Sequence, residues 1–185
     1  TNIALTTGTM NNTTYVYRTT NSGANWAQVF SQLNGQINAL WFTSIWNTNV
    51  FMQGNPVGGR WSLWKSTNSG LNWDSAGLYL PQSGTESGWN NSMYCYNGRI
   101  WFGTNNSRIY YSADTGISWN VQSTLPENNS YTIVGNPGGS IVFTGGATLL
   151  KSTNSGINWL SNASIGSGNF GGLATVYPFS YWWYV

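Results

Sequence analysis

Charged side chains are scarce in this sequence of 185 residues. Asp, Glu, Lys and Arg make up 5% of it and the net charge is +2, whereas about 25% of an ordinary soluble domain is charged. The six basic residues are scattered along the chain, so they form no track for a phosphate backbone. We therefore expect no nucleic-acid partner.

Histidine is absent, and Cys95 is the only cysteine. These two absences exclude an internal disulfide, a Ser-His-Asp or Cys-His catalytic site, and a zinc or iron–sulfur centre. No apolar run approaches the roughly 18 residues of a membrane span, and we see no secretory signal. We expect no cofactor, no metal ion and no membrane insertion.

Aromatic residues and short repeats are abundant instead. The sequence is 16% aromatic with 12 tryptophans, and an octapeptide occurs four times. Its copies begin at residues 19, 66, 112 and 152, so they stand 47, 46 and 40 residues apart. A repeat of about 40 to 50 residues indicates the blades of a β-propeller. The four copies read TTNSGANW, STNSGLNW, SADTGISW and STNSGINW.

Each octapeptide has the chemistry of a tight turn. The Asn or Asp at its third position can accept hydrogen bonds from backbone N–H groups ahead of it, and the glycine at its fifth position can adopt a positive φ. The closing tryptophan starts the next strand, where its ring can fill space between blades. Four equivalent copies favour a structural role over one active site. The residues given this role are Asn21, Gly23, Trp26, Asn68, Gly70, Trp73, Asp114, Gly116, Trp119, Asn154, Gly156 and Trp159.

The octapeptides resemble the Asp-box, or BNR, repeat Ser-x-Asp-x-Gly-x-x-Trp of sialidases, other glycoside hydrolases, sortilin-like receptors and propeller lectins. Three copies carry Asn in place of Asp, and the first begins with Thr19 in place of Ser. The resemblance implies a hairpin between the third and fourth strands of each blade. It also implies that these hairpins lie on the face away from the usual ligand.

Turn residues divide the rest of the chain into strands, and we see no helix. We expect strands at 37–43, 50–52, 61–65 and 73–76, then at 91–96, 100–103, 108–112 and 118–122, then at 131–135, 141–144, 148–151 and 158–160. The sequence therefore predicts an all-β propeller of about four four-stranded antiparallel blades over residues 1–179. Five blades, or part of a larger propeller, are the alternatives.

The two ends of the chain differ from the repeat. Strands are expected at 2–7 and 15–18, so the first blade has no inner strand of its own. Residues 171–176 read as an unpartnered strand, which we expect to complete the first blade and close the ring. Residues 180–185 are a surplus apolar strand and a candidate surface for homo- or hetero-assembly.

Acidic residues are too few for the chemistry of related hydrolases. Glycosidases need two facing carboxyl groups; sialidases, as the resemblance implies, need an arginine cluster, a tyrosine nucleophile with a glutamate partner, and an aspartate. Asp114 belongs to an octapeptide and Asp74 follows one, which leaves Glu86 and Glu127. We expect these two to be solvated loop charges, set too wide for catalysis. The sequence thus predicts no catalytic residue and no enzyme.

Carbohydrate binding suits the composition, because aromatic faces stack on sugar C–H surfaces while amides and hydroxyls pair with sugar OH groups. In such propellers the ligand face carries the loops between second and third strands and those leading into the next blade, opposite the octapeptides. Our candidates in these loops are Arg60, Trp61, Trp89, Asn105, Arg108 and Tyr131. For Trp61 and Trp89 the alternative is packing between blades.

The sequence therefore favours a non-enzymatic, lectin-like or adhesin-like binding module. Its expected location is extracellular, or on a cell or virion surface, and its expected partners are glycans or a surface glycoprotein. The alternative is a structural or assembly component of a virion or cell-surface fibre. A fragment of a glycoside hydrolase or sialidase is a less favoured third reading.

Overall fold

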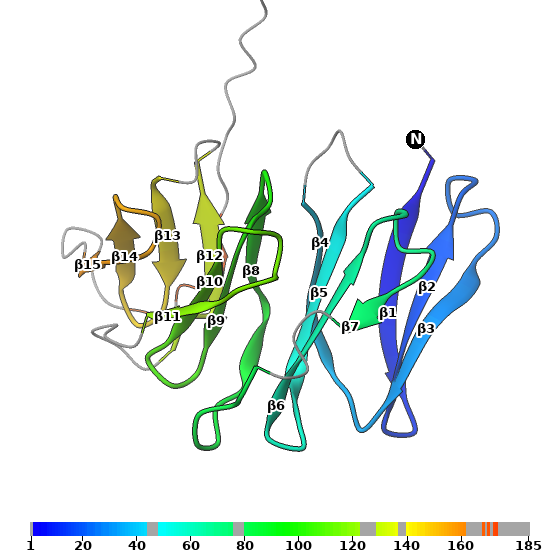
Figure 1. Ribbon diagram of the computed structural model, residues 1–185, viewed down its shortest axis with the longest axis horizontal. Helices are drawn as coiled ribbons and strands as arrows, with labels where there is room; N and C mark the ends of the chain where they lie inside the picture. Colours follow the sequence, from blue (N-terminus) through cyan, green and yellow to red (C-terminus); the bar gives the residue numbers. More distant parts are fainter. Residues whose placement is uncertain are drawn as a thin grey trace, which may run out of the picture.

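The computed structural model describes residues 2–43, 48–75, 80–122, 129–136, 140–161, 168, 170 and 172–173. These residues form fifteen β-strands in four antiparallel sheets (Figure 1). Within the described ranges there is no helix long and apolar enough to cross a membrane.

Each sheet is built from strands that follow one another in the chain, and hydrogen-bonded order matches chain order. Sheet I contains β1 (Ala4–Met10), β2 (Thr13–Thr19) and β3 (Ala27–Leu33), and sheet II contains β4 (Ile37–Phe42), β5 (Val50–Val57), β6 (Arg60–Ser66) and β7 (Asp74–Ser75). Sheet III contains β8 (Gly88–Tyr96), β9 (Arg99–Thr104), β10 (Ile109–Ser112) and β11 (Asn120–Gln122), and sheet IV contains β12 (Thr132–Gly135), β13 (Val142–Gly145), β14 (Leu149–Ser152) and β15 (Leu160–Ser161). The predicted all-β fold of successive antiparallel hairpins is confirmed.

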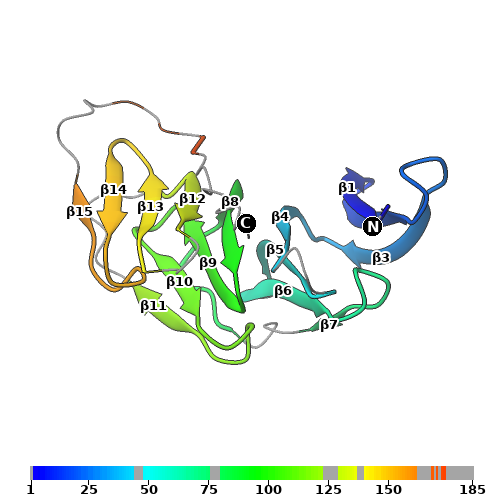
Figure 2. The same cartoon turned by 90° about the horizontal axis from the view of Figure 1, so that it is seen from above.

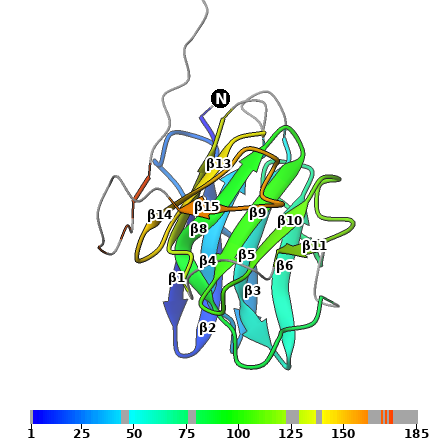
Figure 3. The same ribbon diagram turned by 90° about the vertical axis from the view of Figure 1, so that its left-hand side faces the viewer.

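The four sheets stand side by side in chain order. The inner strands are neighbours, since β4 contacts β8 and β8 contacts β12. Figures 1 and 2 show sheets I and IV at the two ends of the row, and Figure 3 looks along it. Most of the predicted closing strand 171–176, and all of the terminal strand 180–185, lie outside the described residues.

Sheet I has three strands where the others have four. Its edge strand β1 occupies the place that the second strands β5, β9 and β13 hold in their sheets, as the sequence predicts. No described strand pairs with the free edge of β1. The inner-strand position of this sheet is therefore unfilled within the described ranges.

Tight turns of left-handed residues join several strands. Gly58 (φ 61°) and Gly59 (φ 77°) connect β5 to β6, and Asn97 (φ 47°) and Gly98 (φ 79°) connect β8 to β9. Positive φ at both central positions is the type I′ geometry, whose twist matches that of the flanking strands. These two pairs therefore close tight hairpins between their strands.

An apolar core lies between each pair of neighbouring sheets. Side chains alternate between the two faces of a strand, so Phe51 of β5 packs toward sheet III while Met52 packs toward sheet I. Both rings of the Trp61–Phe102 pair are fully buried between sheets II and III, with their centroids 4.9 Å apart. Each buried side chain of this size stabilises the fold by roughly 1.5–3 kcal/mol, so these three cores hold the row of sheets together.

All four octapeptides form the same turn between the last two strands of their sheets. The hydroxyl of the first residue donates to the side-chain oxygen of the third (2.8–3.0 Å) and accepts the N–H of the glycine (2.8–3.0 Å). The oxygen of the third residue also accepts the N–H of the seventh (2.9–3.0 Å). Positive φ occurs at the glycine (78–91°) and also at the residue before it (57–61°). The copies with Asn and the copy with Asp therefore form the same kind of turn, as predicted.

Three of the octapeptide tryptophans pack between sheets, as predicted for all four. Trp73, Trp119 and Trp159 are partly buried against the cores between sheets I and II, II and III, and III and IV. Trp26, which closes the first octapeptide, is 44% exposed. The first octapeptide therefore differs from the others in its surroundings and not in its turn.

Candidate functional site

The loop leading into sheet III folds over the turn between β5 and β6, on the lower side of Figure 1. The N–H of Gln82 donates to the carbonyl of Gly59 (2.9 Å), and the N–H of Trp61 donates to the carbonyl of Leu80 (3.0 Å). Arg60 and Pro81 form an isolated antiparallel bridge. Two loops that the sequence assigned to one face are therefore in direct contact.

Glu86 anchors this loop from inside the protein. It is 2% exposed, so the expectation of a solvated loop charge is wrong for this residue. Its Oε1 accepts hydrogen bonds from the indole N–H of Trp61 (3.1 Å), the backbone N–H of Ser83 (2.8 Å) and the hydroxyl of Tyr110. Its Oε2 is buried and has no hydrogen-bond partner among the described residues. Three donors on one oxygen offset much of the cost of burying the carboxylate.

The pKa of Tyr110 is also changed in this arrangement. Burial, and then the hydrogen bond to Glu86, raise the pKa of Tyr110 to about 12, while its hydrogen bonds with Trp61 and Arg108 act in the opposite sense. The phenol is therefore a neutral donor at physiological pH. Its ring stacks on Phe102, with centroids 4.8 Å apart and planes 11° from parallel.

The end of β9 gathers three further loop segments. The carbonyl of Thr104 accepts the N–H of Ser130 (3.0 Å), and the N–H of Thr104 donates to the carbonyl of Arg108 (3.1 Å). Asn105 pairs with Ser87 twice, because its Oδ1 accepts the Ser87 N–H (2.8 Å) and its own N–H donates to the Ser87 carbonyl (3.1 Å). Segments 86–89, 105–108 and 129–131 therefore meet around this strand end.

Trp89 and Tyr131 form an aromatic pair at this meeting point. Their ring centroids lie 4.7 Å apart with an angle of 62° between the planes, an edge-to-face arrangement. Both side chains are half-buried. The indole Nε1 of Trp89 is buried with no partner among the described residues, so the partly open part of the ring is its carbon surface.

The structure thus separates the six predicted ligand residues into three kinds. Arg60 is exposed, and Asn105, Arg108, Trp89 and Tyr131 are half-buried along one loop face. Trp61 is fully buried with its N–H on Glu86, which corresponds to the packing alternative. Sequence reasoning missed Glu86 and Tyr110 as partners because they are 24 residues apart and meet only in the folded chain.

The other described acids serve local structure. Hydrogen bonds from the side chain and backbone of Ser118 lower the pKa of Asp114 to about 2, and Asp74 accepts the backbone N–H of Lys65 (3.1 Å). Glu127 lies outside the described ranges. Among the residues that the structure describes, no three His, Cys, Asp or Glu side chains lie together as a metal site.

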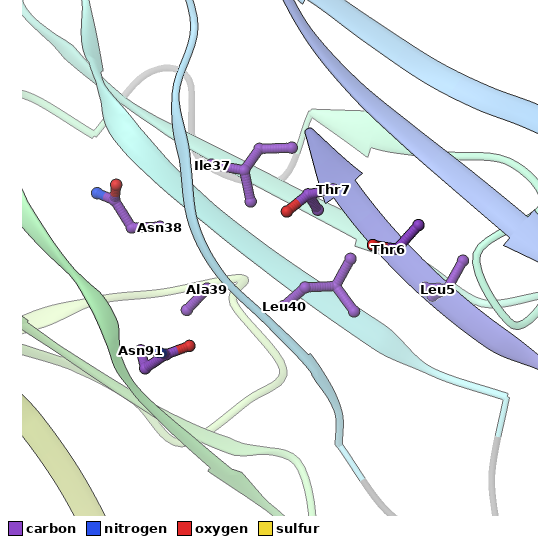
Figure 4. Close-up of a pocket in the computed structure, with 8 residues that line it drawn as sticks. All are labelled: Leu5, Thr6, Thr7, Ile37, Asn38, Ala39, Leu40 and Asn91. Atoms are coloured by element: carbon purple, nitrogen blue, oxygen red, sulfur yellow. The ribbon is translucent and has the colours of Figure 1, made fainter. Parts of the chain in front are cut away.

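A cavity of about 260 Å³ lies elsewhere, between β1 and β4 (Figure 4). It is lined by Leu5, Thr6 and Thr7 of β1, by residues 37–40 of β4, and by Asn91 of β8. None of the six predicted ligand residues lines it. The cavity opens beside the free edge of β1, where an inner strand of sheet I would lie.

No family model and no curated protein matches the chain. Among solved structures it is similar to a GH74 xyloglucanase from Xanthomonas campestris (TM-score 0.61, 14% identity, 86% of this chain and 28% of that one). It is also similar to a GH74 enzyme from Niastella koreensis (0.54, 18%, 82% and 26%) and to YCF48 from Cyanidioschyzon merolae (0.51, 13%, 86% and 59%). The chain spans about a quarter of the two GH74 chains and less than two thirds of YCF48. At these identities the likeness shows the fold alone: the chain folds as a β-propeller, with sheets I to IV as its blades.

Proposed function

We propose that this chain is a non-enzymatic, glycan-binding propeller module whose ligand face is the loop side around the end of β9. The observation that carries the proposal is the half-buried Trp89–Tyr131 pair, with centroids 4.7 Å apart. Partly open aromatic rings set in a face of amides and hydroxyls suit the C–H surfaces and OH groups of a sugar.

Polar side chains beside the pair complete the proposed face. Asn105 and Arg108 are half-buried on the same turn, and Asn106 between them is exposed. Amide and guanidinium groups can donate to sugar oxygens without needing an oppositely charged ligand. A nearly neutral protein that carries these groups is suited to a neutral glycan.

The absence of enzymatic activity belongs to the same proposal. Glu86 lies in the loop that leads into this face, and its Oε1 is already occupied by three donors. Hydrolysis of a glycosidic bond needs two carboxyl groups that face each other across the substrate. Asp74 and Asp114 each hold backbone N–H groups of their own hairpins.

We also infer that the octapeptides are Asp-box repeats. Their hydroxyl, Asn or Asp, and glycine positions make one hydrogen-bonded turn in all four copies. The turns lie between the last two strands of each blade, where the resemblance places an Asp box. An extracellular, cell-surface or virion-surface location fits this reading and is part of the proposal.

A glycan array probed with the whole chain tests the function. We expect binding to a subset of neutral glycans, lost in Trp89→Ala and weakened in Tyr131→Ala. Trp41→Ala is the matched control, because Trp41 is 40% exposed and lies on β4, outside the loops of the proposed face. Absence of binding to every glycan, or equal loss in Trp41→Ala, would contradict the proposal.

A further inference from the structure

The three internal blade interfaces follow one contact rule. In each of them an octapeptide glycine lies against the second-strand residue of the preceding sheet. A Cβ on Gly70 would lie 2.7 Å from Leu5, one on Gly116 would lie 2.8 Å from Phe51, and one on Gly156 would lie 3.2 Å from Trp101. Glycine is therefore the socket and the second-strand side chain is the knob that fills it.

The knobs occupy one register position. Each is the cross-strand partner of the residue just before its own octapeptide: Leu5 pairs with Arg18, Phe51 with Lys65, and Trp101 with Tyr111. In sheet IV the same register gives Phe143, which pairs with Lys151. Phe143 is therefore the fourth knob, and no described octapeptide follows it to supply a socket.

The first octapeptide supplies the fourth socket. A Cβ on Gly23 would meet only Trp26 of its own turn, at 3.8 Å, among the described residues. Trp26 is the octapeptide tryptophan with 44% exposure, whereas its three counterparts are packed against blade interfaces. Among the described residues, the glycine socket of sheet I is therefore empty and the knob of sheet IV has no socket. Sheets I and IV stand at the two ends of the row (Figures 1 and 2).

We propose that the two ends of the row bind each other between two copies of this chain, with Phe143 of one copy against Gly23 and Trp26 of the next. A knob at one end and a socket at the other make a head-to-tail contact. The contact would reproduce the geometry that the chain already uses three times. Phe143 is half-buried, so part of its apolar ring is open to a partner. The Lys151 ammonium lies 5.9 Å from the centroid of this ring.

Sedimentation and light scattering of the 185-residue chain test the proposal. We expect masses of at least twice 20.3 kDa, with dissociation to the monomer on dilution. Phe143→Glu and Gly23→Asn each remove one side of the contact, and both should be monomeric. Ile117→Glu and Gly58→Asn are the matched controls, since Ile117 is 67% exposed and no atom lies within 4 Å of a Cβ on Gly58, whose φ is also positive. These two should associate like the parent chain.

Mixing the two monomeric variants identifies the head-to-tail geometry. Phe143→Glu keeps its socket and Gly23→Asn keeps its knob, so an equimolar mixture should form a species of about twice the monomer mass. A parent chain that stays monomeric at every concentration would overturn the proposal. Association that survives both variants, or a mixture that stays monomeric, would overturn it as well.

Discussion

Replacing Glu86 tests whether this residue is a buried hydrogen-bond anchor or an ordinary loop charge. In Glu86→Ala the indole N–H of Trp61, the hydroxyl of Tyr110 and the N–H of Ser83 all lose their acceptor. A buried donor left unsatisfied costs roughly 1–3 kcal/mol, and water that enters the vacated space will satisfy part of the set. We therefore expect a loss of about 3–5 kcal/mol in the free energy of unfolding, which is large for a single loop residue.

Glu86→Gln is the informative partner of this variant. An amide oxygen can take the place of Oε1 and accept the same three donors, while the new NH2 group replaces Oε2, which has no partner among the described residues. That NH2 group is itself a buried donor without an acceptor among the described residues, so we expect a loss of about 1–3 kcal/mol, smaller than that of Glu86→Ala.

Urea unfolding at pH 7 measures the free energy of unfolding of both variants. The midpoint urea concentration of each variant is compared with that of the parent, provided that the slope of the free energy against urea concentration is unchanged. Asp74→Ala is the control, because the Asp74 carboxylate accepts one backbone hydrogen bond at the surface, and its removal should cost less than about 1 kcal/mol. Equal effects of Glu86→Ala and Glu86→Gln would refute the anchor role. A loss under about 1 kcal/mol in Glu86→Ala would refute it too.

Three further predictions concern the octapeptides and the buried thiol. The pKa of Asp114 is lowered from 3.8 to about 2, so its stabilisation is complete above about pH 4 and is lost as the pH falls through 2. In thermal unfolding, acidification from pH 5 to pH 2 should therefore destabilise the parent more than Asp114→Asn, by up to about 1 kcal/mol at this surface site. The same pH dependence of stability in both proteins would contradict this. Gly116→Ala should cost about 1–3 kcal/mol more than Gly58→Ala in urea unfolding, since both glycines have a positive φ but only Gly116 faces Phe51; equal losses would remove the socket argument. Cys95 is 5% exposed and burial raises its pKa, so a thiol reagent should label it only at the rate of unfolding; rapid labelling of the native protein would show that the core between sheets II and III is open.

The fold was predictable because its signal is local and repeated. Within each octapeptide the hydroxyl, the Asn or Asp side chain and the glycine are at most four residues apart, and four copies at similar spacing imply stacked units. Asn-Gly pairs are typical of two-residue hairpin turns, and Asn97-Gly98 forms one between β8 and β9. Strand ends were less predictable: β5 runs to Val57, beyond the expected 50–52, and β7 is limited to Asp74–Ser75.

The site was predictable only as a set of loops. Their shared face follows from strand order, but burial depends on contacts across the fold. Trp61 and Glu86 are 25 residues apart in the chain, and their hydrogen bond decides that neither is open to solvent. A loop glutamate and a strand tryptophan have no local sequence pattern that predicts such a pair. Trp61 was therefore a ligand candidate, with packing between blades as the alternative.

The most direct test of the proposed function is the spectrum of the tryptophan indole N–H groups during titration with a glycan selected on the array. We expect the Trp89 resonance to shift most and to saturate with the ligand, because its ring belongs to the proposed binding face, while the resonances of Trp26 and Trp61 stay in place. A saturating shift at Trp26 with Trp89 unchanged would contradict it.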